Sequence, residues 1–116
     1  MIIENFETQG VMVLRLTGDF ISEPDQLTFQ QKVRDLVRVG NTRIVVDLQH
    51  VHYINSCGIG SLVGALTTLR RSGGDIFLAQ STREVRTVFE TAQLQLIFKF
   101  HPTVEDAIRT VAGRDS

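Results

Sequence analysis

The chain has 116 residues, of which 42% are hydrophobic and 22% are charged, and its formal net charge is -1. This length and balance are typical of one globular domain, and the near-neutral charge argues against a nucleic-acid-binding surface. The single cysteine, Cys57, excludes an internal disulfide. No apolar stretch could span a membrane, and the acidic start MIIENFE lacks the basic flank of a signal peptide. We therefore expect one cytoplasmic domain over residues 1–116, without membrane insertion.

The chain begins with a pattern that predicts two strands joined by a hairpin. Residues 1–7 and 11–17 are rich in apolar and β-branched side chains, and Gly10 between them tolerates the positive φ of a short turn. Alternation along the second strand places three side chains toward the core: Met12, Leu14 and Leu16.

A helix and a buried strand are predicted next. Ser22 can cap the helix, and Gly40 follows its end. Residues 42–48 form a β-branched run that is typical of a strand covered on both faces, and we expect Asp47 to orient the loop at its end. The side chains that the helix is expected to bury are Phe29, Val33, Leu36 and Val37.

The second half of the chain alternates between helical and strand patterns. A helix begins near Gly58, and a strand covers residues 75–80. Ser81 with Glu84 predicts a capping box for the next helix, and a short strand near 97–100 precedes a last helix. The expected buried side chains of the three helices are Ile59, Leu62, Val63, Leu66 and Leu69, then Val85, Val88 and Phe89, then Val104, Ala107, Ile108 and Val111.

The order of these elements predicts an α/β fold. Strands that alternate with helices form a largely parallel sheet with right-handed crossovers, and the opening hairpin adds one antiparallel strand. We expect a mixed, mostly parallel sheet of about five strands with four helices.

The segment INSCGIG, residues 54–60, places a hydroxyl, a thiol and two glycines at a helix start. A phosphate-cradling loop with Cys57 as nucleophile would need an arginine six residues later, where this chain has a valine. A dinucleotide-binding turn would need its third glycine one position before Gly64. His50 and His52 with the cysteine lack a fourth zinc ligand. We therefore expect no catalytic residue, no metal and no cofactor.

The residue types of this segment indicate a recognition surface instead. Asn55 or Ser56 can cap the helix, whose free N–H groups favour negative charge nearby. Gly58, Gly60 and Gly64 remove side chains, so that another backbone or a partner could approach the helix closely.

The stretch from Val45 to Gln80 resembles the core of the STAS domain, the fold of bacterial anti-sigma factor antagonists. That family has an Asp-Leu-x-x-Val run, followed by Asp-Ser-Ser/Thr-Gly-Leu/Ile-Gly at a helix start. The residues of this chain that match are Asp47, Leu48, Val51, Ser56, Gly58, Ile59 and Gly60.

The resemblance implies a binding partner rather than a substrate. Family members bind an anti-sigma factor, usually a GHKL-type serine kinase, which phosphorylates the residue before the motif glycine and so breaks the complex. A phosphatase reverses this step, and a homodimer is compatible with the resemblance. The implied contact surface includes the exposed face of the following helix with Thr68 and Arg71, and its central residues are Asn55, Ser56, Cys57, Gly58, Ile59, Gly60, Ser61 and Gly64.

Three positions depart from the family pattern. Cys57 stands at the phosphoacceptor position, Asn55 replaces the motif Asp, and Ile21 stands where the family has an acidic residue. Three interpretations stay open: a binder without the usual switch, phosphorylation at Ser56, and a thiol sensor at Cys57. An alternative function is an accessory subunit of a transporter ATPase or of a stress-signalling assembly.

Overall fold

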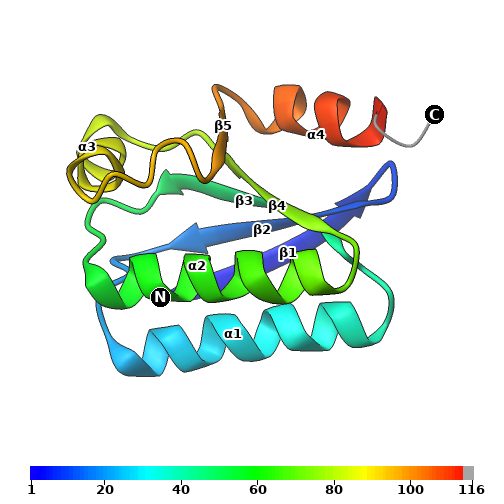
Figure 1. The fold of residues 1–116 in the computed structure, drawn as a ribbon, viewed down its shortest axis with the longest axis horizontal. Helices are drawn as coiled ribbons and strands as arrows, with labels where there is room; N and C mark the ends of the chain where they lie inside the picture. Colours follow the sequence, from blue (N-terminus) through cyan, green and yellow to red (C-terminus); the bar gives the residue numbers. More distant parts are fainter. Residues whose placement is uncertain (114–116) are drawn as a thin grey trace.

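The computed structural model describes residues 1–113. Figure 1 shows a twisted sheet with α1 and α2 side by side on one face and α4 on the other. The elements in chain order are β1 (Ile2–Thr8), β2 (Val11–Thr17), α1 (Glu23–Arg38), β3 (Arg43–His50), α2 (Ser56–Arg71), β4 (Asp75–Ala79), α3 (Arg83–Thr91), β5 (Lys99–His101) and α4 (Val104–Gly113).

The five strands lie in the sheet in the order of the chain, from β1 to β5. β1 and β2 are antiparallel, and every later pair is parallel. This topology confirms the predicted α/β class with one antiparallel strand. It also brings the carboxyl ends of β2, β3 and β4 to one end of the sheet, where the loops after them meet.

The β1–β2 turn consists of Gln9 and Gly10, whose φ angles are 53° and 77°. Two successive positive φ angles characterise the tight turn that suits the right-handed twist of a hairpin. The glycine was predicted from its freedom to adopt this φ, whereas the glutamine adopts it because the strand pairing on both sides requires it.

The sheet is covered on both faces. The larger core lies between the sheet and α1, α2 and α3, and it contains Leu14, Leu16, Phe20, Phe29, Leu62, Leu69 and Phe89. A smaller core lies under α4 and contains Val11, Val13, Val45, Phe77, Ala79, Val104, Ala107, Ile108 and Val111. The sequence pattern assigned only the Met12, Leu14 and Leu16 face of β2 to the core, but α4 also buries Val11 and Val13 on the opposite face.

Most of the helix faces agree with the predicted periodicity. Val37, Val63 and Val88 are only partly buried, and the other predicted side chains are buried. Ser22 caps α1 as predicted, because its Oγ accepts a hydrogen bond from the Asp25 N–H at 3.3 Å.

The start of α3 differs from the predicted capping box. Thr82, not Ser81, is the N-cap, and its Oγ1 accepts from the Val85 N–H at 3.2 Å. Gln80 has a φ of 59°, so the chain turns sharply after β4 and the helix begins one residue later than predicted. The strand boundaries also shift, since β3 continues to His50 and β5 covers only residues 99–101.

Candidate functional site

The loop between β3 and α2 lies beside the loop between β2 and α1. Phe20 forms an isolated bridge with Ile54, and its N–H donates to the Tyr53 carbonyl oxygen at 2.9 Å. Gly18 N–H donates to the His50 carbonyl oxygen at 3.1 Å. The two loops therefore form one continuous surface at the carboxyl end of the sheet.

Asn55 joins this surface to the first turn of α2. Its Oδ1 accepts from the N–H groups of Cys57 at 2.9 Å and Gly58 at 3.4 Å. Its Nδ2 donates to the Ile21 carbonyl oxygen at 3.0 Å. Of the two predicted caps, Asn55 is thus the one that the helix uses, and Ser56 is the exposed first residue of the helix.

Gly58 is required by close packing inside the domain. A Cβ at this position would overlap the Phe20 carbonyl oxygen and lie 2.5 Å from Ile54 Cγ1. At Gly64 a Cβ would lie 3.0 Å from Nε2 of Gln30 on α1. Of the two predicted alternatives at Gly58, close approach by another backbone is therefore confirmed, and the β2–α1 loop fills the space that a partner would need.

The predicted contact residues divide into an exposed and a buried group. Asn55, Ser56 and Gly60 are exposed, and Cys57 and Gly64 are half-buried. Gly58 and Ile59 are largely buried. Ser61 is fully buried, so its predicted place on the exposed face of the helix is wrong; it points to the same side of α2 as Leu62 and Ala65, toward the core. Arg71 is exposed, whereas Thr68 is half-buried and, with Gly64, faces Gln30 and Arg34 of α1.

A shallow apolar groove of about 470 Å³ lies between the start of α2 and α3. The α2 side contributes Ser56, Ile59 and Gly60, which the motif had indicated. The α3 side was not predicted. Two exposed threonines one turn apart among the charged residues of α3 were the sequence feature that could have indicated it. The residues on that side are Thr87, Val88, Thr91 and Ala92.

Exposed apolar side chains lie on the two paired loops and in the connection after α3. Tyr53 is 67% exposed and Ile21 is 44% exposed, each on one of the two paired loops. Leu96 and Ile97, in the connection after α3, are also exposed. Apolar side chains that gather in this way are typical of a protein contact surface rather than of a catalytic cleft.

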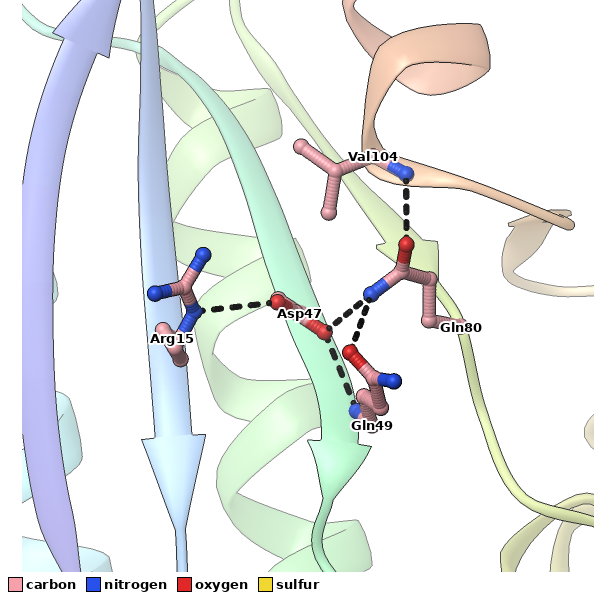
Figure 2. A network of polar contacts seen from close by, with 5 residues as sticks. All are labelled: Arg15, Asp47, Gln49, Gln80 and Val104. Carbon is pink, nitrogen blue, oxygen red and sulfur yellow. Dashed lines mark hydrogen bonds and ion pairs between the residues drawn. The ribbon is translucent and has the colours of Figure 1, made fainter.

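Asp47 is buried at the end of β3 and organises the strand ends, as Figure 2 shows. Its Oδ1 accepts from the Gln49 N–H and from Gln80 Nε2, both at 3.0 Å, and its Oδ2 accepts from Arg15 Nε at 3.3 Å. Gln80 Oε1 in turn accepts from the Val104 N–H at 3.4 Å, at the start of α4. The network confirms that Asp47 orients the strand end, and it links β2, β3, β4 and α4.

Within residues 1–113, no three His, Cys, Asp or Glu side chains are arranged to hold a metal ion. His50 and His52 are both exposed. None of the helices in this part of the chain is long and apolar enough to cross a membrane. The chemistry at the candidate site is that of an exposed amide, an exposed hydroxyl and a half-buried thiol beside apolar side chains.

Comparison with known proteins gives the same picture of the fold. The family model of the STAS domain matches residues 3–107. The anti-sigma F factor antagonist of Paenibacillus polymyxa is 21% identical over 109 residues, which cover 94% of this chain and 91% of the relative. The crystal structure of the protein TM1081 from Thermotoga maritima superposes with a TM-score of 0.87 at 24% identity, covering 94% of this chain and 93% of that chain.

The anti-sigma factor antagonist SpoIIAA is similar in two states. Its unphosphorylated form has a TM-score of 0.82 at 24% identity and 97% coverage of both chains. Its phosphorylated form has a TM-score of 0.73 at 22% identity, covering 95% of this chain and 99% of that chain. At this level of identity the likeness establishes the fold.

Proposed function

Because the chain belongs to the STAS domain family, we propose that it is a binding module of the anti-sigma factor antagonist type. The relative from Paenibacillus polymyxa carries that name, and SpoIIAA has been solved with and without phosphate. The proposed partner is an anti-sigma factor, of the serine-kinase type that the family commonly binds. Binding would release the sigma factor that this partner holds.

The observation that carries the proposal is the surface around the first turn of α2. Asn55 and Ser56 are exposed there, and Tyr53 and Ile21 project from the adjoining loops. Apolar and aromatic side chains around a polar centre are the composition of a protein–protein interface. The groove between α2 and α3 extends this surface on its other side.

We further propose that Cys57 leaves this module without the usual off-switch. The half-buried Cys57 occupies the position before the motif glycine, and a thiol does not accept phosphate from a serine kinase. Ser56 supplies a hydroxyl nearby, but successive helical residues project about 100° apart, so it does not take the same direction. The complex would then persist under conditions that dissociate family members with Ser or Thr.

The test uses the kinase-type anti-sigma factor of the source organism, with Mg²⁺ and ATP. Binding by the wild-type chain is measured by calorimetry, and Tyr53→Ala should weaken it at least about tenfold, as expected for a central aromatic contact. Thr110→Ala, at an exposed position on α4 away from this surface, is the matched control. If the chain binds a transporter ATPase subunit and no anti-sigma factor, the proposal is wrong.

Intact-mass measurement after incubation with ATP tests the missing switch separately. We expect no added phosphate on the wild type and one phosphate on Cys57→Ser. Phosphate on the wild type that Ser56→Ala removes would instead establish Ser56 as the acceptor. Selective alkylation of Cys57 near neutral pH, much faster than that of free cysteine, would favour the thiol-sensor interpretation.

A further inference from the structure

The outer edge of β1 faces no other strand in the described part of the chain. Around a two-residue turn, the flanking residues Thr8 and Val11 form a hydrogen-bonded pair, and bonded residues then alternate along the strand. Every second residue of β1 therefore directs its N–H and C=O away from β2. These residues are Ile3, Asn5 and Glu7, and the side chains of residues 4–7 are all exposed.

We propose that two copies of this chain associate through their β1 strands, antiparallel about a twofold axis that passes beside Asn5. A seven-residue edge strand with free donors and acceptors is a template for strand addition, and a twofold axis satisfies both copies with the same surface. In this register, Asn5 lies opposite Asn5 of the second copy, and Ile3 lies opposite Glu7. All seven residues of β1 are then paired.

Charge complementarity on the α1 face favours this register. A groove of about 630 Å³ lies between β1 and α1, and its lining includes Ile3, Leu27, Lys32 and Arg34. Glu7 of the second copy, directly opposite Ile3, would place its carboxylate at the mouth of this groove. The groove also contains Asp35, but this carboxylate already accepts from Gln31 at 2.8 Å and pairs with Arg38 at 3.4 Å.

The opposite face of the strand is complementary as well. Glu4 would lie opposite Phe6 of the second copy, whose ring centroid lies 5.6 Å from the Arg15 guanidinium carbon of its own chain. The Glu4 carboxylate of each copy thus approaches the Phe6–Arg15 pair of the other copy. If the two β1 strands slid past each other by two residues in one direction, Glu4 of one copy would lie opposite Glu4 of the other. If they slid by two residues in the other direction, residues 2 and 3 of each copy would have no partner in the second strand. Neither alternative combines full pairing with separated charges.

The first test is the mass of the intact chain in solution. Light scattering and sedimentation should show a concentration-dependent rise from 13.0 kDa toward twice that mass. Glu7→Lys brings a third cation to the groove and should weaken association at least about tenfold, or about 1.4 kcal/mol. Glu105→Lys makes the same charge change at an exposed site on α4 and should leave association unchanged.

A covalent trap locates the contact. In a Cys57→Ala background, Asn5→Cys should form an intermolecular disulfide under mild oxidation, since directly opposed Cα atoms lie about 5.5 Å apart. Thr67→Cys in the same background should not. A wild type that stays monomeric at millimolar concentration overturns the proposal. A dimer that Asn5→Cys fails to trap, or that Glu105→Lys weakens equally, also overturns it.

The proposal does not rest on the anti-sigma function, because β1 contributes no residue to the surface around α2. Calorimetry with the anti-sigma factor should give the same affinity for Glu7→Lys and for the wild type. Loss of dimer with retained partner binding therefore separates the two proposals, and so does the reverse result.

Discussion

At the scale of single residues, the candidate site is held by backbone approach and by one amide side chain. Gly58 allows the Phe20 carbonyl to contact the first turn of α2, and Asn55 bonds both that turn and the Ile21 carbonyl. An aspartate at position 55 could still cap the helix, but it could not donate to the Ile21 carbonyl. The asparagine therefore fastens the β2–α1 loop to the helix in a way that the family's usual aspartate cannot.

Gly58→Ala should lower the free energy of unfolding by about 2–4 kcal/mol, because the added methyl group overlaps a backbone oxygen that cannot move without its loop. Chemical denaturation measures this loss. Gly60→Ala, two residues later, is the matched control, since a Cβ there would lie 3.8 Å from Gln26 Nε2. The control should be neutral or more stable by about 0.5–1 kcal/mol. Equal losses in both variants would contradict the crowding explanation, because only position 58 lies against a backbone oxygen.

At the scale of elements, Asp75 joins three parts of the fold at the start of β4. Its carboxylate accepts from Lys99 Nζ of β5 at 2.9 Å and lies 3.5 Å from Arg70 Nε of α2. Burial on its own would raise the pKa of Asp75, but the Lys99 ammonium, the Ile76 N–H and Arg70 together hold that pKa below its ordinary value of 3.8. The charged form is therefore the one that stabilises the folded chain.

Asp75→Asn should cost about 1 kcal/mol of unfolding free energy at pH 7, the upper range for a partly exposed ion pair. A carboxyl with a lowered folded pKa stabilises the fold above its unfolded pKa, and this contribution disappears as pH falls through the folded value. The difference in unfolding free energy between Asp75→Asn and the wild type should thus become smaller below about pH 4. Denaturation at pH 7 and pH 3 checks this, with exposed Glu105→Gln as control. The same difference at both pH values would contradict the ion-pair explanation.

Predictions from the sequence were correct for elements whose local signals agreed. They failed where two neighbouring positions were both suited to the same structural role. The order of the elements along the chain, the Ser22 cap and most of the inward faces of the helices followed from periodicity and cap chemistry. Ser81 and Thr82 both offer a cap three residues before a helical N–H, and only the turn at Gln80 decides between them. Ser61 seemed exposed because it is polar, yet its position on the helix places it in the core. The groove beside α3 exists because the connection from β4 to β5 places α3 next to the start of α2. No local sequence pattern contains that contact between two helices.

At the scale of the whole molecule, the sheet separates two cores of unequal size. The face under α1, α2 and α3 buries most of the aromatic residues, whereas α4 covers a smaller group of aliphatic side chains with Phe77. The start of α4 is joined to the sheet by Gln80. Because an element with less buried apolar surface separates at lower cost, α4 is expected to open before α2.

Native-state hydrogen exchange should show this difference. Amides of α4 should exchange through openings about 1–3 kcal/mol below the global unfolding free energy, whereas β3 amides should exchange only on global unfolding. Amides of α2, which packs on the larger core, are the internal comparison and should resemble those of β3. Equal protection in α4 and β3 would show that the two cores separate together.

Because β2, β3 and β4 run in the same direction, the candidate site lies at one end of the sheet and the opposite end is available for a label. The connections after α1 and α2 lie at the end of the sheet opposite to the start of α2 (Figure 1). Val39 in the first of them is 73% exposed, and the space beside Gly40 and Gly73 is open. A fluorophore on Val39→Cys, in a Cys57→Ala background, would therefore report the tumbling of the complex without touching either proposed interface.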